Sequence, residues 1–164
     1  TSSASVTPTA THHPVGEVTV SIDCPETVKI TGGSRYFHVF VNITDVTDFD
    51  AAQYDISYDP KVIKVQDVLA GEIGDTLIPI EEWGYVPANT QGTLRIVNSV
   101  PKSPGVSGEG YLADIYFRVF GDPGESTDIS FVEGFGEPEG YLMIGDNTGF
   151  EITSDWTDGS VTIE

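Results

Sequence analysis

The side chains that could do chemistry in this chain are mostly carboxylates. The 164 residues include 26 Asp and Glu against 7 Lys and Arg, with close carboxylate pairs at Glu81 and Glu82 and at Asp45 and Asp48. A glycosidase needs two carboxyls held about 5 to 9.5 Å apart across a cleft. In so acidic a chain such pairs arise by chance, and no long insertion indicates a cleft. We therefore expect no hydrolytic activity.

Motifs for nucleophilic or metal chemistry are missing from the sequence. The single cysteine, Cys24, and the histidines His12, His13 and His38 stand in no recognisable nucleophile or metal-ligand spacing. The segment 145–149 (GDNTG) lacks the spaced acidic residues of a calcium loop, and Asp and Asn also favour tight turns. The sequence predicts a chain that is not an enzyme and that carries no catalytic residue, metal or cofactor of its own.

The net charge of −19 limits the possible partners. Phosphate backbones and anionic membrane surfaces would be repelled, so we expect no nucleic-acid binding. No stretch reaches the roughly 20 apolar residues of a membrane span, so we expect no membrane insertion. We interpret the charge mainly as a source of solubility outside the cell.

Short apolar-alternating runs separated by Gly, Pro, Asp and Asn are typical of strands. Residues 1–16 are rich in Thr, Ser, Ala and Pro and are predicted to be a linker, followed by one β-domain over 17–164. We predict an all-β, two-sheet sandwich of about nine strands. The predicted strands are Val18–Ile22, Tyr36–Ile43, Ala51–Tyr58, Ile63–Leu69, Leu77–Tyr85, Thr93–Ser99, Tyr111–Phe120, Asp128–Val132 and Gly159–Ile163, with a possible extra pair at Tyr141–Ile144 and Phe150–Thr153.

Alternation along three of these strands predicts which side chains face the core. The predicted inward residues are Ala52, Tyr54, Ile56, Tyr58, Leu94, Ile96, Tyr111, Ala113, Ile115, Phe117 and Val119. The predicted outward residues are Gln53, Asp55, Ser57, Arg95, Val97, Ser99, Leu112, Asp114, Tyr116 and Arg118. Apolar Val97, Leu112 and Tyr116 among them indicate either a flat interaction surface or the scattered exposed apolar residues of any protein.

Several segments, in order, resemble the cohesin family. The segment 51–63 (AAQYDISYDPKVI) resembles the third cohesin strand with its aromatic-Asp-Pro turn, and 63–71 (IKVQDVLAG) fits the hydrophobic strand that follows it. The segment 89–96 (NTQGTLRI) resembles the turn and sixth strand, 108–119 (GEGYLADIYFRV) the eighth strand, and 159–163 (GSVTI) the terminal strand. The region 72–88 matches poorly.

The resemblance implies a nine-stranded jelly roll that binds a dockerin, a small calcium-loaded helical module. It also implies a monomeric module of a larger secreted or cell-surface protein, with calcium on the partner alone. The dockerin would lie across strands three, five, six and eight. By position, the contacts would be Gln53, Asp55, Ser57, Arg95, Val97, Ser99, Val106, Leu112 and Asp114. Asp55 would fix the orientation of the partner, and Leu112 and Val97 would form the desolvated centre.

Two other functions stay open. A carbohydrate-binding module would need a coplanar row of exposed aromatic rings, for which Trp83, Tyr85 and Trp156 are the candidates unless they belong to the core. A structural or adhesion spacer of a surface protein would need no dedicated face. Asn42-Ile43-Thr44 is a sequon, so glycosylation at Asn42 is a further possibility.

Overall fold

The computed structural model describes residues 18–100, 105–132, 142–152 and 154–164, and the predicted linker lies outside them. The described residues form twelve strands and no helix, so nothing among them could cross a membrane as a long apolar helix. The strands are β1 (Val18–Asp23), β2 (Thr27–Val28), β3 (Tyr36–Ser57), β4 (Ile63–Ile73), β5 (Thr76–Ile78), β6 (Ile80–Tyr85), β7 (Thr93–Ser99), β8 (Val106–Val119), β9 (Ser126–Phe131), β10 (Met143–Asp146), β11 (Ser154–Thr157) and β12 (Gly159–Ile163).

The all-β class is confirmed, and the differences in strand number have local causes. The predicted strand Leu77–Tyr85 is divided between β5 and β6 at Pro79, which has no N–H to donate to a ladder. Of the possible extra pair, the first member appears as β10, while the second makes only an isolated bridge between Glu151 and Gly145. Tyr141 and Thr153 lie outside the described residues.

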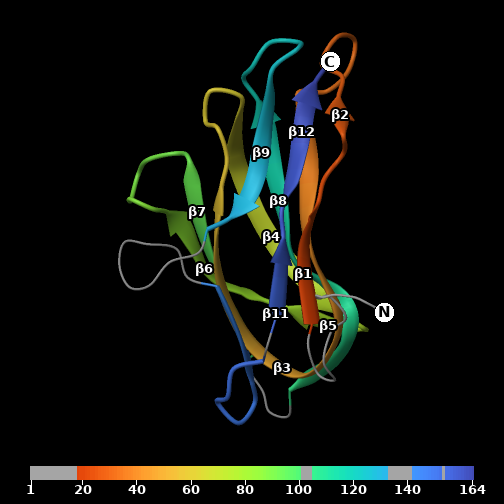
Figure 1. The fold of residues 1–164 in the computed structure, drawn as a ribbon, viewed down its shortest axis with the longest axis vertical. Helices are drawn as coiled ribbons and strands as arrows, with labels where there is room; N and C mark the ends of the chain where they lie inside the picture. Colours follow the sequence, from red (N-terminus) through yellow and green to blue (C-terminus); the bar gives the residue numbers. More distant parts are fainter. Residues whose placement is uncertain (1–17, 101–104, 133–141, 153) are drawn as a thin grey trace, which may run out of the picture.

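The longest strand, β3, joins two predicted strands into one and belongs to both sheets. Its first half pairs with β8 and β1, and its second half pairs with β7, β9 and β10. Register shifts between Val41 and Phe49 bend it, and Asp48 takes a left-handed φ of 59°. Figure 1 shows β3 curving round the base of the molecule from one layer to the other.

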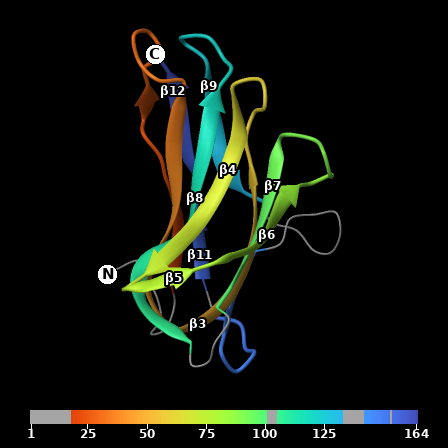
Figure 2. The ribbon, with the colours of Figure 1, turned by 180° about the vertical axis from the view of Figure 1, so that it is seen from behind.

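The two layers follow from this shared strand. One contains β5, β4, β8, the first half of β3 and β1, with β11 added in parallel to β1. The other contains β6, β7, the second half of β3 and β9, continued by β12 and β2. Figure 2 shows β4 and β5 in front when the molecule is seen from behind.

The core between the layers confirms the predicted inward sides of β3 and β7. Ala52, Tyr54 and Ile56 are at most 1% exposed, and Leu94 and Ile96 are fully buried. Burial of each of the larger aliphatic side chains, Ile56, Leu94 and Ile96, stabilises the fold by about 1.5 to 3 kcal/mol relative to an exposed position. Cys24 packs against the edge of this core, and its thiol donates to the carbonyl of Ser160 at 3.2 Å. Partial burial raises the pKa of that thiol.

A β-bulge in β8 reverses part of the predicted alternation. Ala113 pairs with Val41, but the next residue of β3, Asn42, pairs with Tyr111. Leu112 is therefore an extra residue, and the bulge turns its side chain into the core, where it is fully buried. The prediction that Leu112 faces outward is wrong, and so is the inward position of Tyr111, which is only partly buried.

Two glycines allow β4 to lie close to this bulge. A Cβ atom on Gly71 would lie 2.2 Å from the carbonyl oxygen of Tyr111, and one on Gly110 would lie 1.9 Å from that of Glu72. Because real Cβ atoms do not approach backbone so closely, both positions need glycine.

The turn at 145–149 is also built as expected: Asp146 Oδ1 accepts from Thr148 N at 2.9 Å and from Phe150 N at 3.0 Å. These hydrogen bonds, with one from the Thr148 hydroxyl as the largest cause, lower the pKa of Asp146.

Candidate partner-binding face

Six of the nine predicted contact residues lie together on the outer surface of one sheet. The second half of β3 pairs with β7 so that Gln53 lies opposite Val97 and Asp55 lies opposite Arg95. Residues opposite each other on paired strands present their side chains on the same face. Ser57 and Ser99 extend the two rows at either end. The outward alternation predicted for these two strands is therefore confirmed.

The centre of this face is an ion pair. Arg95 Nε donates to Asp55 Oδ1 at 2.8 Å, and Arg95 Nη2 donates to Asp55 Oδ2 at 3.0 Å. The Asp55 side chain is 1% exposed, whereas that of Arg95 is 21% exposed. Both carboxylate oxygens already accept from the guanidinium, so Asp55 is not available to a partner as the sequence predicted. Instead it holds Arg95 in one orientation, since a bidentate pair fixes the planar group.

Strands β6 and β9 flank the two central strands and add residues that the sequence did not indicate. Glu82 of β6 pairs with Val97 and is exposed, and Gly84 pairs with Arg95 without covering it by a side chain. On the other side, Ser57 donates its hydroxyl to the carbonyl of Ser130 at 3.4 Å. Glu82 was not among the predicted contacts because region 72–88 matches the cohesin pattern poorly, and in the structure the register with β7 shifts between Ile80 and Glu82.

The other three predicted contacts lie on β8, which belongs to the opposite sheet. Val106 pairs with Phe49 and is 9% exposed, and Leu112 is fully buried at the bulge. Asp114 is on the outer surface of that opposite sheet, where its Oδ1 lies 2.7 Å from His38 Nδ1. The prediction that β8 completes the binding face is therefore wrong for Val106, Leu112 and Asp114. The strand that stands beside β3 there is β9.

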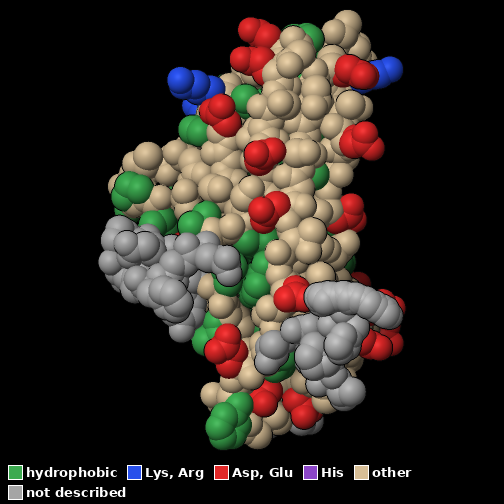
Figure 3. Space-filling view, viewed as in Figure 1, with side chains coloured by type: hydrophobic (Ala, Val, Ile, Leu, Met, Phe, Trp, Pro, Cys, Tyr) green, Lys and Arg blue, Asp and Glu red, His purple; other side chains and the backbone are tan. Residues whose placement is uncertain are grey.

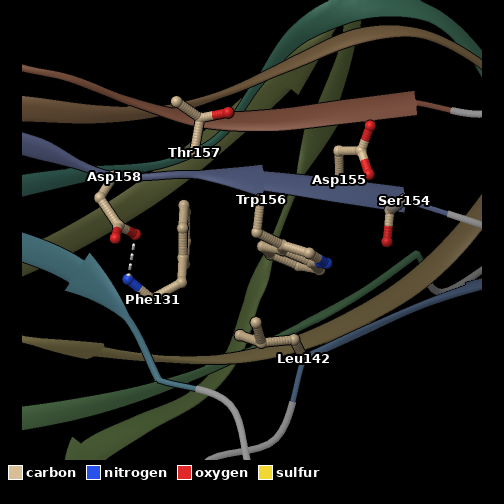
Figure 4. Close-up of a pocket in the computed structure, with 7 residues that line it drawn as sticks. All are labelled: Phe131, Leu142, Ser154, Asp155, Trp156, Thr157 and Asp158. Atoms are coloured by element: carbon tan, nitrogen blue, oxygen red, sulfur yellow. Dashed lines mark hydrogen bonds between the residues drawn. The ribbon is translucent and has the colours of Figure 1, made fainter. Parts of the chain in front are cut away.

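The aromatic residues proposed for a carbohydrate-binding row pack against the core instead. Trp83 and Tyr85 meet edge to face at an interplanar angle of 85°, so they are not coplanar. Trp156 packs against Phe131 at 5.0 Å between ring centroids and against Tyr54 at 6.0 Å. Figure 4 shows Trp156, Phe131 and Leu142 lining a hollow of about 460 Å³. Trp83, Tyr85 and Trp156 are therefore partly buried against the core and do not form the coplanar row that a carbohydrate-binding module would need.

Comparison with known proteins decides the family. The cohesin domain family matches residues 18–163, which is most of the chain. The chain belongs to the cohesin domain family. Curated protein sequences gave no match.

Solved cohesin structures share the fold at low sequence identity. A non-cellulosomal cohesin from the archaeon Archaeoglobus fulgidus is 22% identical with a TM-score of 0.66, covering 90% of this chain and 91% of that chain. A type I cohesin–dockerin complex from Clostridium thermocellum gives 21% identity and a TM-score of 0.68, covering 90% and 99%. The cohesin module of a Clostridium perfringens family 33 glycoside hydrolase gives 14% identity and a TM-score of 0.65, covering 90% and 96%.

Cohesin domains are non-catalytic interaction modules, and they are typically found in extracellular or cell-surface scaffold proteins. In this cohesin, no group of three or more His, Cys, Asp or Glu within the described residues is arranged to hold a metal ion. Figure 3 shows acidic side chains spread over the face seen there, with Lys and Arg side chains only near its upper end. The oriented Asp55–Arg95 pair and the polar side chains beside it are suited to recognising another protein.

Proposed function

We propose that this cohesin binds a dockerin across the outer surface of β6, β7, the second half of β3 and β9, called here the dockerin face. The observation that carries the proposal is the orientation of Arg95 by Asp55 at the centre of a row that also presents Gln53 and Val97. Similar solved structures are cohesins in complex with dockerins, which supports a partner of the same class.

The chemistry of the dockerin face divides into two parts. Val97 is a partly buried apolar side chain between Gln53 and Glu82, so a partner can remove it from water at little cost. The guanidinium of Arg95 is already held in one orientation by Asp55, which lowers the entropy lost on binding. Burial of Val97 therefore contributes affinity, and Arg95 with its polar neighbours contributes specificity.

The finer parts of the proposal concern the surroundings of the module. We propose a monomeric module of a larger secreted or cell-surface protein, where it assembles extracellular complexes. Calcium would be required by the loops of the dockerin and not by the cohesin. Chelator should thus abolish complex formation while leaving the melting temperature of the isolated cohesin unchanged.

Titration calorimetry with dockerins encoded in the same genome tests the proposal. Val97→Asp places a charge at the centre of the dockerin face and should weaken binding by about 100-fold, since an unpaired buried charge costs several kcal/mol. Lys29→Ala is the control, because the Lys29 side chain is 78% exposed just after β2, outside the four strands of the dockerin face, and its loss should have no effect. If no dockerin from that genome binds, the module is a spacer. If Val97→Asp binds like the wild type, the dockerin face is misassigned.

A further inference from the structure

The bulge in β8 creates a feature on the sheet opposite the dockerin face. By inserting Leu112 into the core, it turns Tyr111 outward beside its β3 partner, Asn42. A hollow of about 460 Å³ lies at this point, between β1, β3 and β8. Sites for small ligands typically have volumes of about 300 to 1,000 Å³. Bulges commonly re-aim side chains in this way beside functional sites.

The hollow is lined by groups that hydrogen-bond to hydroxyls. Ser21, Asn42, Thr44 and Glu109 line it together with Tyr111. Asn42 Nδ2 donates to Asp23 at 3.2 Å, which fixes its amide. Within the described part of the chain, the Asn42 carboxamide oxygen and the hydroxyl of Ser21 make no hydrogen bond. The hollow therefore offers oriented but unused donors and acceptors.

A row of aromatic side chains continues from the hollow across the first half of β3 and β8. Tyr111 meets Phe40 edge to face at 5.2 Å between centroids. Phe40 lies 6.2 Å from His38, which lies 4.7 Å from Tyr116, which stacks on Tyr36 at 5.2 Å. Tyr36 is 39% exposed. Among the described residues, the ring of Tyr111 meets no aromatic ring but that of Phe40, and Tyr111 itself stands at the edge of the hollow.

This combination of an aromatic wall and hydroxyl-binding groups matches a sugar ring, whose C–H faces stack on aromatic rings while its hydroxyls form hydrogen bonds. Charge decides between neutral and ionic ligands. The carboxylates in and beside the hollow include those of Glu109, Asp23 and Glu72, the β4 partner of Tyr111, and the whole chain carries −19. An anionic polysaccharide is repelled there, whereas a neutral polysaccharide is not.

We propose that the hollow at Tyr111 binds a neutral polysaccharide, on the sheet opposite the dockerin face. The module would then hold a glycan with one sheet while the other sheet holds its protein partner. The residues of this site are not Trp83, Tyr85 or Trp156, which pack against the core. The site exists only because the bulge reverses the alternation of β8 at Tyr111.

Affinity electrophoresis in native gels tests this proposal, because a chain of charge −19 migrates readily and polysaccharide in the gel retards a protein that binds it. The probes are galactomannan, xyloglucan, mixed-linkage β-glucan and arabinoxylan, with polygalacturonate as the anionic comparison. The protein is made in a host without N-glycosylation, so that Asn42 carries no sugar. We expect retardation by at least one neutral polysaccharide.

Variants locate the binding. Tyr111→Ala should weaken it roughly tenfold, the value of one ring contact, and Tyr111→Phe should retain it. Ser21→Tyr fills the hollow from the β1 side and should abolish retardation, with melting temperatures confirming that each variant is folded. Phe150→Ala, which removes an aromatic ring that is 73% exposed elsewhere, is the matched control. Val97→Asp should bind the polysaccharide normally, which separates this site from the dockerin face.

Three outcomes would overturn the proposal. The first is the absence of retardation by all four neutral polysaccharides, and the second is retardation by polygalacturonate alone. The third is binding that survives both Tyr111→Ala and Ser21→Tyr. Dimerisation through the aromatic row, seen by sedimentation and lost with Phe40→Ala, would reassign the row to a second copy of the chain.

Discussion

A buried polar cluster joins the two sheets, and its removal gives a strong test of the fold. Asn98 of β7 is fully buried, and its Oδ1 accepts from the hydroxyl of Tyr54 at 2.9 Å. Its Nδ2 donates to the carbonyl of Leu112 at 2.9 Å and to that of Pro79 at 3.2 Å. Asn98 thus links its own sheet to the bulge of the opposite one.

Asn98→Leu keeps the volume of the side chain but removes a hydrogen-bond partner from the Tyr54 hydroxyl and from the carbonyls of Leu112 and Pro79. The Tyr54 hydroxyl and the Leu112 carbonyl are in the interior, where an unsatisfied polar group costs about 1 to 3 kcal/mol. We expect the free energy of unfolding to fall by about 3 kcal/mol. For a domain of this size that lowers the melting temperature by about 6 to 12 °C. Tyr54→Phe, which orphans only Asn98 Oδ1, should cost about 1 to 2 kcal/mol.

Urea denaturation of the wild type, both single variants and the double variant measures these costs. Because the two side chains share one hydrogen bond, the double variant should lose about 1 kcal/mol less than the sum of the singles. A loss below about 1 kcal/mol for Asn98→Leu, or strict additivity, would refute the argument that this cluster is dry and ties the sheets together.

Three further predictions follow from buried groups. Leu112→Asp should unfold the protein, seen as loss of the cooperative melting transition, because it places an unpaired carboxylate in the core; a folded variant would contradict the bulge. Asp55→Ala should weaken dockerin binding and lower the free energy of unfolding by about 1.5 to 3 kcal/mol, because it removes the two charged hydrogen bonds that Asp55 accepts from Arg95. Wild-type affinity in this variant would show that the orientation of Arg95 plays no part in binding. Burial raises the pKa of Tyr58 to about 12, above the roughly 10 of an unfolded chain. The folded state therefore favours the protonated hydroxyl, and this stability is present below about pH 10 and is lost as the pH rises toward 12. Denaturation midpoints from pH 8 to 12 should fall less steeply for Tyr58→Phe, and an identical pH dependence would contradict the assignment.

The sequence alone predicts the buried and outward side chains correctly where apolar alternation runs unbroken along a strand. Along Ala51–Ser57 and Thr93–Ser99, the inward residues are buried and the outward residues form the dockerin face, because a side-chain period of two leaves one choice once one face is apolar. The partner of Asp55 was not predictable in this way. Cross-strand register, which no local pattern encodes, places Arg95 opposite it.

The sequence alone does not predict which side chains of β8 are buried where a bulge interrupts that strand. Tyr111, Leu112 and Ala113 are all apolar enough for the core, so the pattern does not show that one of them is extra. Once the bulge is placed, the sides of Tyr111 and Leu112 exchange relative to simple alternation. The glycines at 105, 108 and 110 were the available signal, since Gly inside a strand commonly marks a bulge or a close backbone approach.

The membership of β3 in both layers has a consequence for how the molecule opens. A sandwich whose sheets share no strand can in principle lose one sheet while the other persists, but here separating the layers means breaking β3 itself. The domain should therefore behave as a single cooperative unit in native-state hydrogen exchange. The slowest amides of β7 and β8 should exchange with the same free energy and the same denaturant dependence, although the two strands lie in different layers.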